Sequence, residues 1–161
     1  MRRARTEGRR VATAYEAAVR YLAGRPRSVA EVSRHLRGKR YDDAAIDDAI
    51  ERLRAQRYVD DLDFARYWIE QRSRFRPKGD RLLVSELTRM GVARETIDAA
   101  MGEATAEAEP DRARRALARP MTRWQALEPA ERKRKIHAYL AARGFDYDVI
   151  DEVIARPDRE T

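Results

Sequence analysis

The amino-acid sequence predicts an all-α protein with three tandem three-helix repeats in an elongated arrangement. Apolar residues recur at helical spacing along almost all of the 161 residues. Seven glycines and six prolines leave little material for hairpin turns, which disfavours an all-β fold. The third observation is a pattern that repeats about every fifty residues. Because such modules contact mainly their neighbours, we expect an elongated molecule.

Nine helices are expected, each marked by an apolar stripe and by residues that begin or end helices. Ser28 with Glu31 is a capping-box pattern, and Asp42 or Asp43, and later Asp146, can serve as N-caps. The stripes lie within residues 14–22, 28–36, 42–53, 61–75, 83–90, 97–101, 110–117, 129–140 and 146–154. The residues that end or interrupt helices are Gly24, Pro26, Pro77, Gly79, Gly91 and Gly144, and the prolines that start helices are Pro110 and Pro129.

The register of these helices indicates an internal repeat. Leu36, Leu87 and Leu140 align, with spacings of 51 and 53 residues. Five further columns match around them: Val32, Leu83 and Ile136; Tyr41, Val92 and Phe145; Ile46, Ile97 and Ile150; Asp47, Asp98 and Asp151; and Ile50, Met101 and Ile154. Two amphipathic helices joined by a tight turn would give part of this pattern by themselves. Six matched columns instead favour three modules at 12–60, 61–104 and 105–157, preceded by a basic flexible arm at 1–11.

The charge balance points to a polyanionic partner. The chain carries 35 Lys and Arg against 28 Asp and Glu, a net charge of +7. More than half of this excess lies in residues 1–11, whose five Arg and one Glu give +4. Nucleic acid is the first candidate for such a partner. The remaining charges are interleaved, which is typical of solvated helix faces.

Several classes of site are excluded by composition. The chain has no cysteine, so it has no disulfide, thiolate metal site or cysteine nucleophile, and its two histidines cannot form a metal cluster alone. No nucleophile–base pair is visible, and we therefore expect neither enzymatic activity nor a cofactor. No apolar run approaches the roughly 18 residues of a membrane span, and no signal peptide is evident, so we expect a cytoplasmic protein.

Two basic clusters are candidate contacts for a protein or DNA partner. The first surrounds an expected helix end that also holds Phe75 and Pro77, and comprises Arg72, Arg74, Arg76, Lys78 and Arg81. The second is the run Arg132, Lys133, Arg134 and Lys135 inside an expected helix. Arginine can grip phosphate or carboxylate bidentately. A solvated helix surface is the alternative for both clusters, and the second run turns through about 300°, so it cannot face one groove.

The other polar residues favour structural roles. Asp60 and Asp61 resemble an acid–base or metal pair, but adjacent carboxylates before a helix more often supply an N-cap. The aspartates of the repeat sit in different modules and favour packing or capping. His35 and His137 are single residues beside helical seams. Trp124, in an expected loop at 119–128, either recognises a partner or pins that loop to its module.

A helix-turn-helix DNA-binding transcriptional regulator is the alternative function, since residues 28–53 could form such a unit. The expected third helix begins Asp42-Asp43-Ala44-Ala45 and continues with Asp47 and Asp48. These carboxylates would repel phosphates, which disfavours sequence-specific readout through this module.

Three segments, in order and at matching distances, resemble the RecX family of bacterial regulators of recombination. The matching residues are Tyr58, Asp60, Asp61, Phe64 and Ala65; then Lys78, Gly79, Glu86, Leu87 and Gly91; then Arg143, Gly144 and Phe145. The resemblance covers about residues 14–155. The sequence departs from the family at Leu83, where Ile is usual, and at Arg40 and Arg57, where glycine often precedes the aromatic residue.

The resemblance implies three tandem three-helix repeats, and a mainly structural role for the matching residues. It implies a non-enzymatic protein that binds the RecA recombinase, above all its nucleoprotein filament. Such a protein inhibits the ATPase, strand-exchange and coprotease activities of RecA, and so modulates recombinational DNA repair and the SOS response. We further expect a monomer that binds single- or double-stranded DNA weakly and without sequence preference.

Overall fold

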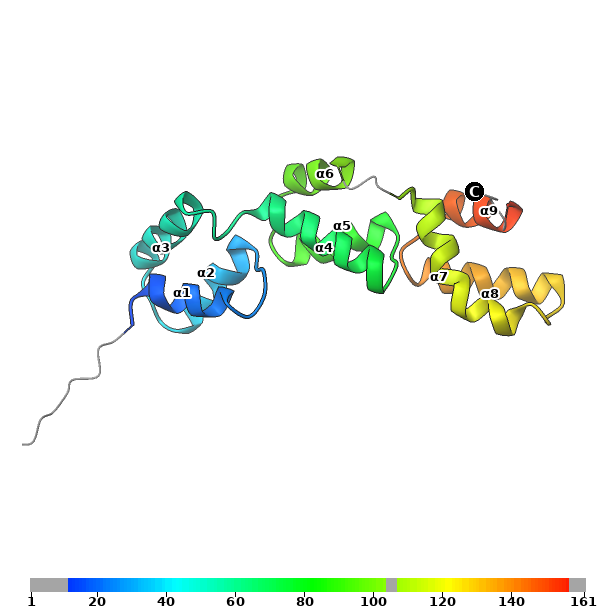
Figure 1. Ribbon diagram of the computed structural model, residues 1–161, viewed down its shortest axis with the longest axis horizontal. Helices are drawn as coiled ribbons and strands as arrows, with labels where there is room; N and C mark the ends of the chain where they lie inside the picture. The colour runs from blue at the N-terminus through cyan, green and yellow to red at the C-terminus, as the bar shows by residue number, and fades with distance from the viewer. Residues whose placement is uncertain (1–11, 104–106, 157–161) are drawn as a thin grey trace, which may run out of the picture. The chain divides into compact units, whose positions relative to one another are not determined.

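The computed structural model describes residues 12–103 and 107–156, which form nine α-helices and no β-strand (Figure 1). The predicted all-α fold class is therefore confirmed, while the predicted basic arm at 1–11 lies outside the described residues. Within the described ranges, none of the helices is both long and apolar enough to cross a membrane. The helices are α1 (Ala14–Leu22), α2 (Val29–Gly38), α3 (Asp43–Ala55), α4 (Asp61–Phe75), α5 (Asp80–Arg89), α6 (Arg94–Glu103), α7 (Glu109–Trp124), α8 (Pro129–Ala141) and α9 (Tyr147–Ala155).

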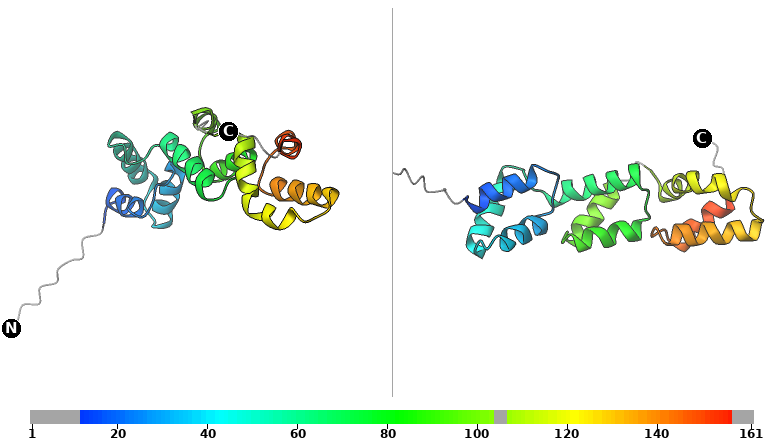
Figure 2. Two further views of the ribbon diagram at one scale, coloured as in Figure 1. Left: turned by 45° about the vertical axis from the view of Figure 1, so that its right-hand side comes forward. Right: turned by 90° about the horizontal axis from the view of Figure 1, so that it is seen from below.

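The chain divides into two compact units, Met1–Val59 and Asp60–Thr161. The first unit holds helices α1–α3, which we call module 1. The second holds module 2, formed by α4–α6, and module 3, formed by α7–α9. Within each module every helix contacts the other two (Figure 2). The three modules are the three tandem three-helix repeats that the sequence predicts.

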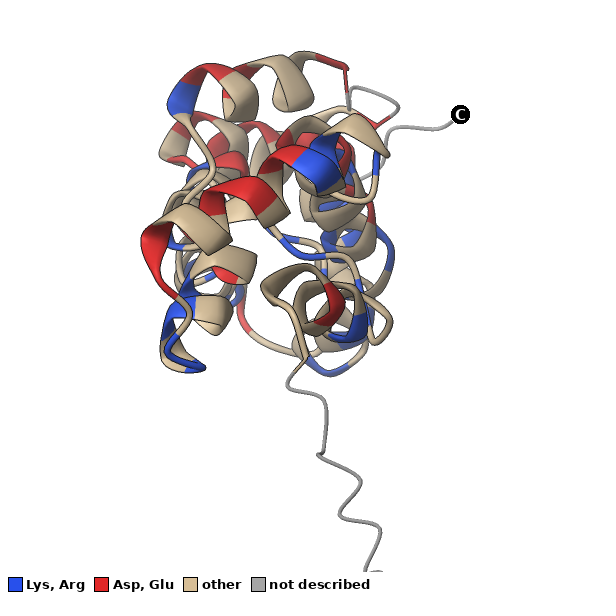
Figure 3. Ribbon diagram, turned by 90° about the vertical axis from the view of Figure 1, so that its left-hand side faces the viewer, with Lys and Arg blue, Asp and Glu red and all other residues tan. Residues whose placement is uncertain are grey.

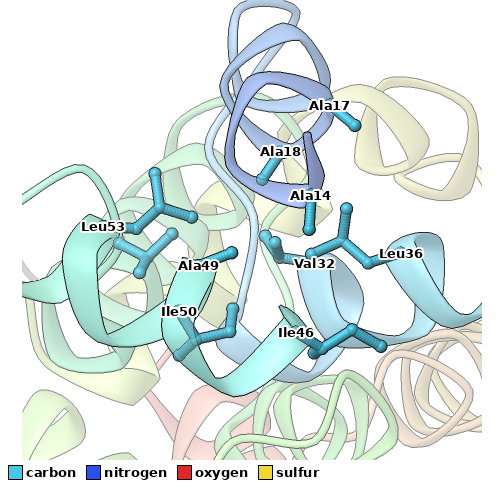
Figure 4. Packing of buried hydrophobic residues seen from close by; sticks show 10 residues of the cluster. Ala14, Ala17, Ala18, Val32, Leu36, Ile46, Ala49, Ile50 and Leu53 are labelled. Atoms are coloured by element: carbon cyan, nitrogen blue, oxygen red, sulfur yellow. The ribbon is translucent and has the colours of Figure 1, made fainter. Parts of the chain in front are cut away.

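Each module has its own hydrophobic core, and the repeat columns supply it. The aligned leucines Leu36, Leu87 and Leu140 are all completely buried, each in a separate cluster of apolar side chains. Figure 4 shows this arrangement in module 1, where the side chains of Ala14 on α1, Val32 on α2 and Ala49 on α3 gather between the three helices. A small hydrophobic core per module explains how a highly charged chain can fold.

Three of the four N-caps that the sequence predicts accept backbone N–H groups as expected. Ser28 accepts the N–H of Glu31 at 3.1 Å, and Glu31 accepts the N–H of Ser28 at 3.0 Å, which completes the capping box. Asp42, not Asp43, caps α3 by accepting the N–H of Ala45 at 2.8 Å. Asp146 occupies the predicted N-cap position of α9, but its side chain makes no capping hydrogen bond.

The turn after the second helix of each module uses a left-handed backbone at the same position. The φ angles there are 66° at Arg40, 81° at Gly91 and 82° at Gly144. Arg57, after α3, also has a positive φ, of 57°. Glycine adopts this conformation without strain, whereas a side chain makes it unfavourable. The two arginines that depart from the family pattern therefore occupy strained positions.

Helix α7 continues farther than the sequence predicts. The loop expected at 119–128 is wrong in its first part, because α7 runs through Pro120 to Trp124. Proline has no N–H, so the Ala116 carbonyl loses its usual helical donor, and the Tyr139 hydroxyl donates to that carbonyl at 3.2 Å instead. Trp124 packs edge-on against Tyr139, with ring centres 5.4 Å apart. Trp124 thus pins this segment to module 3.

Candidate partner-binding surface

The basic cluster at the end of α4 is not one exposed surface. Arg72 Nε donates to Glu86 Oε2 at 3.0 Å, and the Arg72 guanidinium lies 4.3 Å from the centre of the Trp68 ring. Lys78 contacts the other oxygen of Glu86. The side chains of Arg72 and Lys78 are only 27% and 20% exposed. Both cations are therefore already engaged, contrary to the expectation of a uniformly solvated or partner-facing cluster.

Glu86 is the centre of this network and joins α4 to α5. Its Oε2 also accepts the Trp68 indole N–H at 2.9 Å. Burial raises the pKa of Glu86, but hydrogen bonds from Lys78, Trp68 and Arg72 outweigh it and hold the pKa below its usual range. The resemblance to the RecX family implies a structural role for Glu86, and these contacts describe one.

Arg74 and Arg76 are exposed and, with Phe75 between them, form what we call the α4 tip. The Phe75 side chain is 66% exposed although it is aromatic, and the Arg74 guanidinium lies 5.3 Å from its ring centre. Arg76 is the C-cap of α4 and is exposed. Exposed aromatic and arginine side chains together are typical of partner contacts. The α4 tip is thus the portion of the cluster available to a partner.

A glycine–glycine contact joins module 2 to module 3. The Gly79 N–H donates to the Arg143 carbonyl at 3.0 Å. A Cβ on Gly79 would overlap the Gly144 carbonyl, and a Cβ on Gly144 would overlap Leu82. Two segments of the family resemblance, separated by more than sixty residues, therefore meet here. Their glycines allow two backbones to approach each other closely.

An ion-pair network surrounds this contact. Arg112, 4% exposed, binds the Asp80 carboxylate, and the Asp80 N–H donates to Glu109 Oε1 at 2.8 Å. Arg81 reaches across to Asp146, with 3.5 Å between Arg81 Nε and Asp146 Oδ1. Arg81 thus has a carboxylate partner in module 3. Burial raises the pKa of Glu109, and the charges of Asp80 and Asp146 raise it further against the opposing effects of the Asp80 N–H and Arg112.

Arg143 and Phe145 hold the module 3 side of this junction. The Arg143 guanidinium lies 3.5 Å from the centre of the Tyr139 ring. The Phe145 side chain is 1% exposed, and its N–H donates to the Leu140 carbonyl at 3.2 Å. The turn is thereby folded back onto the core.

The basic run in α8 spreads around the helix, as its pitch predicts. Arg132 is half-buried and donates to the Gln125 carbonyl at 3.3 Å. Lys133, Arg134 and Lys135 are exposed, and Lys135 lies 3.9 Å from a carboxylate oxygen of Glu131 one turn earlier. Figure 3 shows that basic and acidic residues are interspersed along the ribbons that face the viewer. These residues do not form one contact surface.

The first segment of the family resemblance begins α4. Asp60 Oδ1 accepts the N–H groups of Leu62 and Asp63 at 2.8 and 3.0 Å, which makes it the predicted N-cap. Asp61 occupies the first helical turn. Phe64 and Ala65 are buried in the module 2 core, whereas Tyr58 is 60% exposed.

The other polar residues that the sequence singled out make separate, local contacts. In the residues that the structure describes, no group of three or more His, Cys, Asp and Glu could hold a metal ion. His35 stacks on Tyr21, and His137 packs at an angle against Tyr147. Asp98 is exposed and pairs with Arg94, with 2.9 Å between Asp98 Oδ1 and Arg94 Nε.

The residues of the module junction belong to the RecX-like segments of the sequence, but the sequence did not predict that these segments meet. The sequence also gave no sign that Arg112 is buried, or that Glu86 binds both Arg72 and Lys78. The paired glycines in the RecX-like segments were the only signal of the junction. No periodic pattern marks Arg112, because the charged face of α7 looks uniformly solvated in the sequence.

Family models match all three modules in order. The model described as "RecX, first three-helix domain" matches residues 14–53, the second three-helix domain matches 60–101, and the third matches 107–154. Together these matches cover most of the chain.

Whole proteins named "Regulatory protein RecX" are also similar. The protein from Mycobacterium sp. (strain JLS) is 35% identical over 154 residues, which cover 92% of this chain and 84% of the relative. The protein from Geobacillus kaustophilus (strain HTA426) is 34% identical over 155 residues, which cover 90% of this chain and 54% of the relative. This chain therefore spans about half the length of the Geobacillus relatives it matches.

Solved structures share the fold. The crystal structure of RecX from Lactobacillus salivarius aligns with a TM-score of 0.79 at 22% identity, covering 88% of this chain and 92% of that one. A second crystal structure of regulatory protein RecX aligns with a TM-score of 0.77 at 20% identity, covering 89% and 72%. With the three matching models and the relatives of similar sequence, these findings establish that the chain belongs to the RecX family.

Proposed function

We propose that this protein binds the RecA nucleoprotein filament and inhibits its ATPase, strand-exchange and coprotease activities. It would thereby modulate recombinational DNA repair and the SOS response in the cytoplasm. The observation that carries the proposal is the ordered match of three RecX domains across residues 14–154. The protein acts by binding, as a monomer and without a cofactor, rather than by catalysis.

The α4 tip is the contact that we assign to the recombinase. Arg74 and Arg76 can pair with carboxylates of a protein partner, and Phe75 supplies an exposed aromatic anchor. The Glu86 network and the glycine junction hold the surrounding helices in place. The tip therefore projects from a pre-organised base, which lowers the entropy lost on binding.

Titration into a single-stranded-DNA-dependent ATPase assay of the host RecA tests the proposed function. We expect ATP hydrolysis and strand exchange to fall at sub-stoichiometric to stoichiometric amounts of the protein. A heat-denatured sample is the control, because it shows whether an unfolded chain with the same positive charge also inhibits RecA. Unchanged rates of both reactions at a several-fold molar excess of folded protein would contradict the proposal.

A weak DNA contact without sequence preference accompanies this function. Each phosphate contact should contribute about −0.9 to the slope of log affinity against log salt on duplex DNA. The helix-turn-helix alternative predicts strong discrimination between unrelated duplexes at physiological salt. Acidic residues at the start of α3 oppose that alternative, because the exposed carboxylates of Asp42, Asp43, Asp47 and Asp48 would repel phosphates.

A further inference from the structure

A hollow of about 590 Å³ lies at one end of module 1, between α1, the end of α2 and the turn that follows. Its lining combines two cations with three aromatic or imidazole rings and includes no carboxylate. The lining residues are Ala12, Ala17, Arg20, Tyr21, His35, Lys39 and Tyr41.

The two cations of the hollow are unpaired in the described part of the chain. Arg20 on α1 and Lys39 at the C-cap of α2 are both exposed, and no described carboxylate oxygen lies within 4.0 Å of either charged group. Arg72 and Lys78 in module 2 differ, because Glu86 binds both of them. An anion entering the hollow would therefore meet charges that no described carboxylate neutralises.

The rings of the hollow are held in fixed positions. His35 stacks in parallel on Tyr21, with ring centres 3.9 Å apart, and the Arg27 guanidinium lies 4.2 Å from the Tyr21 ring centre. The Tyr41 hydroxyl donates to the Ala12 carbonyl at 2.6 Å. Flat, immobilised rings beside free cations are what an unpaired nucleotide chain requires, because its bases stack and its phosphates need neutralising.

The surroundings of the hollow are also positive. Partial burial lowers the pKa of His35, and the charges of Lys39 and Arg27 lower it further. In the sequence, segment 1–11 with its net charge of +4 leads directly into Ala12. A site preceded in the sequence by several cations suits a polyanion better than a single carboxylate.

We propose that this hollow binds the backbone of single-stranded DNA, with Arg20 and Lys39 on the phosphates and the His35 and Tyr41 rings beside the bases. The proposal rests on the DNA contact of the proposed function and assigns that contact to a place. A single strand fits better than a duplex, because only unpaired bases expose their faces to rings.

Fluorescence anisotropy with a labelled 20-mer of thymidylate tests this assignment. The double variant Arg20→Gln with Lys39→Gln should bind about tenfold more weakly, and its salt slope should fall by about 1.4, since each single-strand phosphate contact contributes about 0.7. The matched control is Arg34→Gln with Arg54→Gln, which removes two exposed cations of α2 and α3 outside the hollow. Its affinity should change less than threefold. An equal loss in both double variants would overturn the hollow as the site.

The identity of the ligand is tested in the same format. Tighter binding of a 20-base-pair duplex, or displacement by polyglutamate as effective as by unlabelled thymidylate, would overturn the single-strand assignment. The two histidines give a site-specific readout by NMR, because DNA should shift the ring signals of His35 and leave those of His137 in place. Shifts at His137 alone would also overturn it.

These outcomes separate the site from the proposed function. If the wild-type protein binds no oligonucleotide, the DNA contact and the hollow both fail, while the ATPase assay still decides on RecA inhibition. If both double variants inhibit RecA equally but differ in DNA binding, the hollow is a DNA site distinct from the recombinase contact.

Discussion

The hollow of module 1 and the end of α4 in module 2 contain the same kinds of residue but differ in what their cations bind. Both combine arginine and lysine with aromatic rings. In module 2, Glu86 accepts hydrogen bonds from Arg72, Lys78 and Trp68, so two cations stabilise the fold. In module 1 no described carboxylate reaches the cations of the hollow. A cluster of Lys and Arg in the sequence therefore indicates a binding surface only where no carboxylate of the folded protein pairs with these cations.

The largest expected effect is at the junction that supports the α4 end. We expect Gly79→Ala to destabilise the second unit by about 3 kcal/mol, because its Cβ would overlap the Gly144 carbonyl and neither backbone can move away easily. Thermal unfolding followed by circular dichroism measures the change.

Gly24→Ala is the matched control for this substitution, because a Cβ there meets nothing within 4 Å. It should leave the unfolding temperature nearly unchanged. Equal stability of both variants would show that the two modules do not touch at these glycines.

The next effect separates the engaged cations from the free ones. Glu86→Gln should lower the free energy of unfolding by about 1–2 kcal/mol at neutral pH, since Arg72 and Lys78 lose a charged acceptor. The pKa of Glu86 is lowered by folding, so its stabilisation is present above the ordinary glutamate pKa of about 4.3 and is lost as the pH falls through the folded pKa.

Urea unfolding of the wild type and of Glu86→Gln between pH 3 and pH 7 checks this prediction. The difference between them should shrink as the solution becomes acidic. A difference that stays constant over the whole range would mean that the carboxylate charge contributes nothing.

The third effect concerns binding rather than stability. Arg74→Gln with Arg76→Gln should weaken inhibition of RecA more than tenfold, equivalent to about 1.4 kcal/mol, while stability changes by less than about 0.5 kcal/mol. Arg72 is left intact because its loss would also disturb Glu86. The inhibition midpoint in the ATPase assay is the measurement, and an unchanged midpoint would identify the α4 tip as solvated surface.

The smallest effect tests the strained turns. Arg40→Gly and Arg57→Gly should each raise the free energy of unfolding by about 0.5–1 kcal/mol. Glycine removes the strain of a positive φ, and this gain exceeds the loss that comes from the greater entropy of the unfolded chain. Gly91→Ala, at the equivalent turn of module 2, should have the opposite sign. A loss of stability in both arginine variants would show that their side chains make compensating contacts.

The architecture of the three modules can be predicted from the amino-acid sequence alone. Helical periodicity and the six repeat columns predicted the three modules, because an apolar stripe has to be buried wherever it occurs. Short residue patterns predicted the capping box at Ser28 and the N-cap at Asp60, because these hydrogen bonds join residues that are neighbours in the sequence. The RecX-like segments identified the residues of the junction. The elongated arrangement stays a prediction. A radius of gyration near the value of about 15 Å expected for a compact protein, measured by small-angle scattering, would contradict it.

Only the tertiary structure decided which charges are available. Whether Arg72 is paired depends on Glu86, and whether Arg81 is paired depends on Asp146, and neither partner is a sequence neighbour. The continuation of α7 through Pro120 likewise depends on a hydroxyl from α8. The repeat pattern indicates which residues are buried, because the apolar face of each helix can be recognised in the sequence of that helix. Ion pairing between helices depends on distances that exist only after the chain has folded.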